Sequence, residues 1–283
     1  MAIEHAIVAA AKKRGTISED AYAVAHTSGE PFVASVVDGR GFHARRHEVA
    51  DLAQFIASEL VCDLQQDANP DMLPKWFDEV QDAVEHRFPN IPMGASAACL
   101  IVDRSRVLRL AHVGNCRLFR YAPEHFEGAE RLTKDHTPGL EKEKRRLEGF
   151  CQTGNFRVIR HGQDIPLIDV AEDRLHFLEQ CVGYSRDSLS YTRGFGHARF
   201  RPALTHEPEI CTFELPQDTV NIFALCSHGG SRIVRHVFRR LQQMELDATV
   251  TLEMLSQMAK DRIDEKPKGP RDDTTIIFFK VLP

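Results

Sequence analysis

The chain has 283 residues, of which 42% are hydrophobic and 27% are charged, and this composition favours a folded globular protein over a disordered one. It carries 36 Lys and Arg against 41 Asp and Glu, so its formal charge of −5 gives no global attraction for nucleic acid or an anionic membrane. The 7 Cys are widely spaced without a CxxC pair, which predicts neither a disulfide framework nor a thiolate zinc site. We see no apolar run of roughly 18 residues and no signal-peptide pattern, and we therefore expect a cytoplasmic protein without a membrane partner.

Hydrophobic patterning predicts groups of strands interrupted twice by pairs of helices. Apolar runs bounded by turn residues predict strands over 4–10, 20–27, 31–39, 96–103, 106–114, 116–122, 220–227 and 274–281. Apolar residues three and four apart predict helices over 49–60, 73–84, 233–241 and 252–259. The stretch 140–207 is the least periodic, and we expect there a short helix over 141–147 and otherwise loops. This order predicts one domain, 1–283, in which β-sheets are covered by antiparallel helices.

Several acidic residues stand at the ends of predicted strands. These residues are Glu19 and Asp20 before one strand, Asp38 at the end of another directly before Gly39, and Asp272 and Asp273 before the last strand. Carboxylates gathered from strand ends are the hard oxygen ligands that Mg²⁺ and Mn²⁺ prefer. Each of them can also be explained singly as a turn or cap residue, since Asp-Gly commonly forms a turn after a strand.

The stretch FALCSHGGSR, 223–232, allows a different phosphate chemistry. An apolar strand, two glycines and a predicted helix accompany Cys226 and Arg232, which are separated by five residues as in the phosphate loop of thiolate phosphatases. A helix N-terminus stabilises an anion, the cysteine would be the nucleophile, and Arg232 could clamp the phosphate. Leu225 and Ile233 replace the histidine and the hydroxyl residue that usually flank such a loop. A cysteine-dependent phosphatase is therefore a minor alternative.

Taken in order, several stretches resemble the successive motifs of the PPM family of metal-dependent protein serine/threonine phosphatases. They are RGTISEDAYAV, FVASVVDGRG, GASAACLIVDRSRVLRLAHVGNCRLFRY, LTKDHTP, YTRGFGHARFRPALTHEPEI, FALCSHGG and RDDTTIIFF. The resemblance covers roughly Ala6 to Val281. It implies an α+β fold, an αββα sandwich of two antiparallel β-sheets flanked by antiparallel helix pairs. It also implies that two Mg²⁺ or Mn²⁺ ions bridge a water that attacks phosphoserine or phosphothreonine in a protein.

The resemblance assigns roles to the acidic residues, motif by motif. Asp38 is the catalytic carboxylate that bridges both ions, and Gly39 offers its backbone carbonyl. Glu19 is the acidic ligand of one ion, with Asp20 supporting it through water contacts, and Asp272 is the ligand before the final strand. Arg14 is the candidate for binding the phosphate.

The sequence departs from the family pattern at several of these positions. His228 and Asn115 stand where the family has aspartates, Arg40 replaces a histidine proposed as general acid, Asp273 replaces an asparagine, and His197 usually corresponds to an aspartate. The site has lost negative charge, so one of the two ions should bind more weakly, although the His228 imidazole can still ligate Mn²⁺, Fe²⁺ or Zn²⁺. Two interpretations stay open. The chain is either a phosphatase acting on phosphorylated proteins or a pseudophosphatase that serves as a protein-binding or regulatory module.

Overall fold

The structure is a computed structural model that describes residues 2–12, 16–27, 30–41, 44–66, 69–89, 91–170, 176–181, 187–246, 249–265, 270 and 272–283. Its strands are β1 (Ile3–Ala10), β2 (Asp20–Ala25), β3 (Phe32–Gly41), β4 (Met93–Val102), β5 (Val107–Val113), β6 (Arg117–Tyr121), β7 (Ala129–Arg131), β8 (Phe156–Arg160), β9 (Gln163–Asp164), β10 (Phe177–Gln180), β11 (Ser188–Leu189), β12 (Phe195–Gly196), β13 (Glu209–Glu214), β14 (Asn221–Cys226) and β15 (Thr274–Val281). Its α-helices are α1 (Arg46–Gln66), α2 (Leu73–Arg87), α3 (Glu141–Gln152), α4 (Ser231–Gln243) and α5 (Leu252–Asp264). Within these described ranges, no helix has the length and apolar character needed to cross a membrane.

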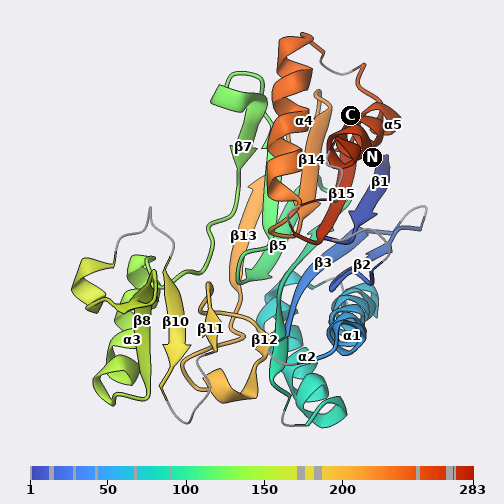
Figure 1. The fold of residues 1–283 in the computed structure, drawn as a ribbon. Coiled ribbons are helices and arrows are strands. Elements are labelled where there is room, and N and C mark those ends of the chain that lie inside the picture. The colour runs from blue at the N-terminus through green and yellow to red at the C-terminus, as the bar shows by residue number, and fades with distance from the viewer. Residues whose placement is uncertain are drawn as a thin grey trace.

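Two antiparallel sheets stack face to face and form the centre of the fold. One has the strand order β1-β15-β14-β6-β7, and the other has the order β13-β5-β4-β3-β2 with β12 paired to β4. Helices α4 and α5 cover the outer face of the first sheet, and α1 and α2 cover the outer face of the second (Figure 1). The predicted α+β fold, an αββα sandwich, is confirmed.

The alternation of side chains along each strand supplies the core of all four layers. In β3, Phe32, Ala34 and Val36 pack between the two sheets, whereas Val33 and Val37 pack under α1 and α2. The same alternation in β15 divides its apolar side chains between the inter-sheet core and the core under α4 and α5. Because both faces are buried, these strands are continuous apolar runs, which is why the sequence predicts them clearly.

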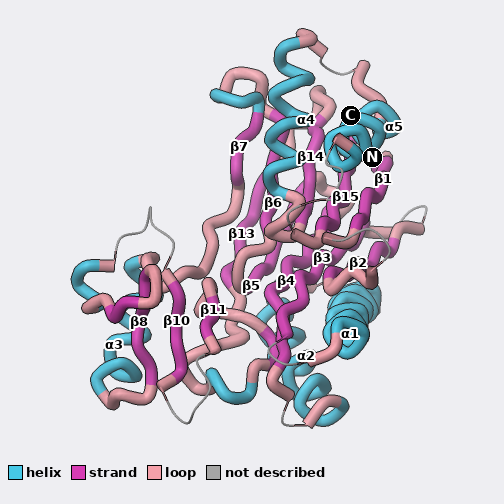
Figure 2. Tube along the Cα trace, in the orientation of Figure 1, coloured by secondary structure: helices cyan, strands magenta, loops and turns pink. Residues whose placement is uncertain are grey.

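The predicted elements were wrong mainly in the stretch 140–207, although strands β7 and β13, which lie outside it, were also not predicted. The helix α3 does not end at residue 147 but continues to Gln152, and the expected loops contain a third, four-stranded sheet of order β11-β10-β8-β9. Figure 2 shows β8 and β10 next to α3, to one side of the stacked sheets. These elements share a small core of their own, which includes Leu147, Phe156, Leu178 and Leu189. Strands this short contain too few residues for their alternation to stand out in the sequence.

Candidate active site

Residues from both central sheets surround one cavity of about 220 Å³. The predicted site residues that line it are Glu19, Asp20, Asp38, Gly39, Arg40, Asn115, His228, Asp272 and Asp273. Arg14, the predicted phosphate-binding residue, lies outside the described residues. The structure thus brings together residues as distant in the chain as Glu19 and Asp273, in agreement with the motif order.

Strand pairing explains this convergence. The register of β2 on β3 sets Asp20 directly opposite Asp38. Asp272 lies just before β15, and β15 pairs with β14, whose end leads into the turn that carries His228. The backbone N–H of His228 donates a hydrogen bond to Oδ2 of Asp38 over 3.0 Å. This bond ties the two sheets together at the cavity.

The carboxylates in the cavity are crowded and partly desolvated. Burial and the nearby Asp272 raise the pKa of Asp38 to about 7. Burial and then Asp38 raise the pKa of Asp20 well above its ordinary value, and Oδ2 of Asp20 is buried without a hydrogen-bond partner among the described residues. Burial also raises the pKa of Glu19, against the opposing effect of Arg46. A divalent cation would relieve both the repulsion and the unpaired oxygen, so the residues present fit a hard metal ion.

Both side-chain oxygens of Asp273 are occupied by hydrogen bonds from the protein. Its Oδ1 accepts a hydrogen bond from the backbone N–H of Lys12, and its Oδ2 accepts from the Arg46 guanidinium and, over 2.9 Å, from the backbone N–H of Glu19. Asp273 therefore fixes the backbone beside Glu19 and the start of α1. Arg46 was not predicted as a site residue, because a basic residue at the start of an amphipathic helix is usually solvated.

His228 and Asn115 stand where the family that the sequence resembles has aspartates. Both side chains are neutral and already contact other residues of the protein. Nδ1 of His228 lies 3.3 Å from Nη2 of Arg117. Arg117 is itself bound by both oxygens of Asp135, over 3.0 and 2.6 Å. Desolvation and then Arg117 lower the pKa of His228, so its ring is neutral at neutral pH. Oδ1 of Asn115 accepts a hydrogen bond from the Ser96 hydroxyl over 2.8 Å.

One wall of the cavity comes from the stretch that the sequence left unassigned. Phe177, Leu189, Ser190 and Tyr191 line the cavity next to the carboxylates. The Tyr191 hydroxyl lies 2.8 Å from Nε2 of the buried His197, whose pKa burial lowers to about 3. His197 is thus connected to the cavity wall through Tyr191. No periodic signal could have identified these residues, because they belong to very short strands and turns.

The stretch around Cys226 does not form a thiolate phosphate loop. Cys226 is fully buried in the core under α4, and burial raises the pKa of its thiol to about 12, so it does not fit a thiolate nucleophile. Arg232 is exposed and is not among the residues that line the acidic cavity. Gly229 is required by close packing, because a Cβ there would lie 1.9 Å from the carbonyl oxygen of Asp273.

A two-sheet sandwich with a cluster of carboxylates between its strand ends is the architecture of a metal-dependent protein phosphatase. The model of the protein phosphatase 2C family matches residues 11–234, and the chain belongs to this family of serine/threonine phosphatases. The family predicted from the motifs is therefore confirmed. No curated protein matches the sequence.

Solved structures share the fold at low sequence identity. A C. elegans sex-determining protein superposes with a TM-score of 0.65 at 19% identity, over 100% of this chain and 66% of that chain. A serine-threonine phosphatase 2C from Toxoplasma gondii gives a TM-score of 0.64 at 15% identity, over 98% of this chain and 94% of that chain. The catalytic domain of the serine/threonine protein phosphatase PstP, in complex with 2 manganese ions, gives 0.57 at 15% identity, over 99% of both chains. These likenesses show the common fold.

Proposed function

We propose that the chain hydrolyses phosphoserine or phosphothreonine in protein substrates with two Mn²⁺ or Mg²⁺ ions, one of which is weakly held. The observation that carries this proposal is the cavity in which Glu19, Asp38 and Asp272 converge beside the unpaired buried oxygen of Asp20. Membership of the phosphatase 2C family supports the reaction, and the manganese ions in the PstP structure support the cofactor. A single domain over 1–283 and a cytoplasmic location belong to the same proposal.

Asp38 would hold both ions, Glu19 and Asp272 would each contribute to one, and the Gly39 carbonyl would complete the set. When bound, the ions would supply an activated water and neutralise charge on the phosphoryl oxygens. The protein keeps these ligands in place through the hydrogen bond from His228 N–H to Asp38 and the one from Glu19 N–H to Asp273.

Positive charge near the cavity would bind the phosphate group of the substrate. Arg40 is exposed and lines the cavity, where it can attract a phosphate dianion. We assign the same task to Arg14 from its position in the motif. Because Arg40 stands where the family has a proposed general acid and a guanidinium does not release its proton, the leaving group would take its proton from water.

The weaker binding of one ion is expected because two positions near the cavity lack a negative charge. His228 and Asn115 are neutral and already engage Arg117 and Ser96, so neither adds a carboxylate to the ligand set. Affinity for hard cations depends strongly on the number of charged ligands. The same observation favours a second candidate function, a catalytically impaired pseudophosphatase that binds a protein partner or regulates one.

Hydrolysis of p-nitrophenyl phosphate and of a phosphothreonine peptide tests the proposal. We expect turnover that requires Mn²⁺ or Mg²⁺ and disappears in EDTA. His228→Asp should raise the rate at limiting Mn²⁺ by about tenfold, because it returns a carboxylate to the site. Initial rates over a Mn²⁺ titration measure both effects.

His86→Asp is the matched control, because it makes the same change at an exposed position on α2 and should leave the rate unchanged. Absence of turnover with either ion, in folded native protein and in folded His228→Asp, would decide for the pseudophosphatase.

A further inference from the structure

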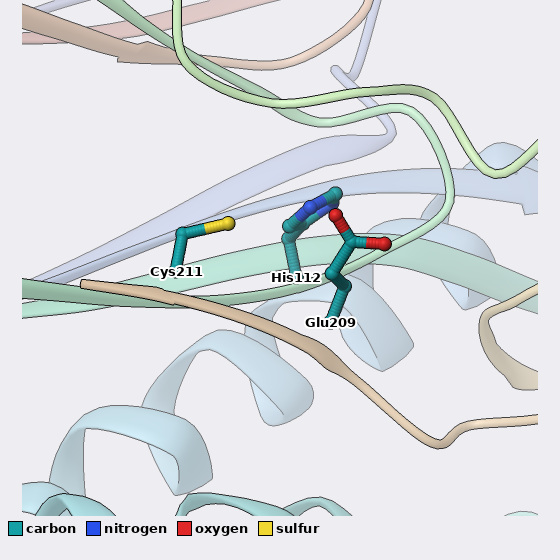
Figure 3. A group of neighbouring side chains, drawn as sticks. All are labelled: His112, Glu209 and Cys211. Carbon is teal, nitrogen blue, oxygen red and sulfur yellow. The ribbon is translucent and has the colours of Figure 1, made fainter.

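A second group of metal-ligating side chains lies on the strand pair β5–β13. His112, Glu209 and Cys211 each offer one ligand atom, and these atoms all lie within 4.8 Å of one another. Figure 3 shows the three side chains extending from the same side of the two strands. None of them lines the acidic cavity. This group is therefore separate from the candidate active site.

The register of the sheet creates this group. Glu209 pairs directly with His112, and Cys211 pairs with Leu110. Residues two apart on a strand face the same way, so Cys211 lies diagonally across from His112 on the face that carries Glu209. Side chains held by paired strands keep their positions more closely than side chains on loops.

The His112 ring has no hydrogen-bond partner within the part of the chain that the structure describes. Its side chain is 0% exposed, and neither of its ring nitrogens makes a hydrogen bond. A buried polar group left unsatisfied costs about 1–3 kcal/mol, so such groups are uncommon unless a ligand or ion completes them. Burial also lowers the pKa of His112 to about 3, so the ring is in the neutral form that binds metal ions.

His136 lies next to both Glu209 and His112. Nδ1 of His136 accepts the backbone N–H of Gly114 over 3.1 Å, so the neutral ring carries its proton on Nε2. That Nε2 lies 3.4 Å from Oε2 of Glu209, and the His136 ring stacks on His112 with centroids 4.6 Å apart. The contact between Nε2 and Oε2 has ion-pair distance without hydrogen-bond geometry, and it places His136 beside one carboxylate oxygen while the other oxygen stays open to a metal, as partners of metal ligands do.

We propose that His112, Glu209 and Cys211 bind Zn²⁺, with water in the fourth coordination position. One imidazole, one carboxylate and one thiolate form a ligand set that suits Zn²⁺, and the soft thiolate disfavours Mg²⁺ and Mn²⁺. Binding would release the thiol proton of Cys211 to solvent. The Glu209 side chain is 31% exposed, which gives the ion access from solvent.

Metal binding to the reduced Asp38→Asn variant of the chain 1–283 tests the proposal, because this change weakens the acidic cavity as a competitor for the metal. We expect one equivalent of Zn²⁺ by titration calorimetry, and with Co²⁺ a thiolate-to-cobalt charge-transfer absorption that Zn²⁺ abolishes. In the Asp38→Asn background, Cys211→Ser should remove this absorption. It should also weaken Zn²⁺ binding by ~100-fold or more, since loss of a residue that only supports a ligand already costs up to about that much. Adding Cys151→Ser, at another half-buried free cysteine, should change neither.

His136→Asn separates support from ligation, since the Asn oxygen can still accept the Gly114 N–H while the contact of Nε2 with Glu209 is lost. Zn²⁺ affinity should fall about 10- to 100-fold with the cobalt–thiolate absorption retained. Zn²⁺ should also slow alkylation of Cys211, but not of Cys151, in the protein without cysteine changes, and mass spectrometry measures this without a variant that has to fold. The proposed zinc site would be wrong if the cobalt–thiolate absorption did not form, or if it persisted in Cys211→Ser. It would also be wrong if Zn²⁺ left the alkylation rate of Cys211 unchanged.

Discussion

Asp38→Asn should lower metal-dependent turnover about a thousand-fold or more while the protein stays folded. The carboxylate lies where β3 meets the turn after β14, with Asp20 directly across the β2–β3 pair and His228 N–H on its Oδ2. Under the proposed function Asp38 would help to hold both ions. Bound metal ions would supply several kcal/mol of transition-state stabilisation, where about 1.4 kcal/mol corresponds to tenfold in rate. Initial rates with Mn²⁺ on p-nitrophenyl phosphate measure the loss.

The thermal midpoint in EDTA distinguishes this loss from unfolding. Asn keeps the shape of Asp38 and its acceptor for His228 N–H but removes a charge crowded by Asp272, so the midpoint should stay the same or rise. Cys226→Ser is the companion variant and should keep its turnover, because the thiol is buried in the core. Turnover that survives Asp38→Asn, or that Cys226→Ser abolishes, would contradict the assignment of the reaction to the acidic cavity.

Glu143→Gln should lower the free energy of unfolding by about 3–5 kcal/mol, the range for breaking a buried charge pair. Glu143 on α3 is fully buried, and its Oε1 accepts from Nε of the buried Arg193 over 2.7 Å. Its Oε2 accepts from Nη2 of Arg146 over 2.9 Å and from the Thr192 hydroxyl over 2.8 Å. The change leaves two guanidiniums without their carboxylate. Chemical denaturation at neutral pH measures the effect.

The pH dependence gives a second check on Glu143. Burial alone would raise its pKa, but the Arg146 and Arg193 guanidiniums hold the pKa below its usual value. A depressed carboxyl pKa stabilises the fold above the unfolded value of about 4.3, and this contribution is lost as the pH falls through the folded pKa. The difference between native and Glu143→Gln stability should therefore shrink in acid.

Glu141→Gln is the control on the same helix. Glu141 is 65% exposed and forms an ion pair with Arg145 over 3.3 Å, so its loss should change stability by less than about 1 kcal/mol. Equal effects of the two variants would contradict the buried network as a source of stability. Because Thr192 follows the cavity residues Ser190 and Tyr191, Glu143→Gln should also impair turnover.

Hydrophobic patterning predicted β-sheets covered by helix pairs, and the resemblance of successive motifs predicted the family. The central strands are buried on both faces and the four covering helices have one apolar face each, so their patterns are local and strong. The carboxylates were predicted in the same way, since Asp38 and Asp272 each stand at a strand end that the chain itself marks. The resemblance to the family, and not the local pattern, marked His228 and Asn115 as positions without a carboxylate.

Only the tertiary structure shows which residues the side chains of the site contact. Asp273 proved to hold the backbone of Lys12 and Glu19, and Gly229 proved to pack against the backbone just before β15. Both depend on distant segments, about which local periodicity carries no information. The third sheet and the cavity wall around Tyr191 were not predicted, because their strands are too short to give a recognisable alternation in the sequence. The His112 group likewise arises from the register of β13 on β5, and strand register is set by packing across the sheet and not by spacing along the chain.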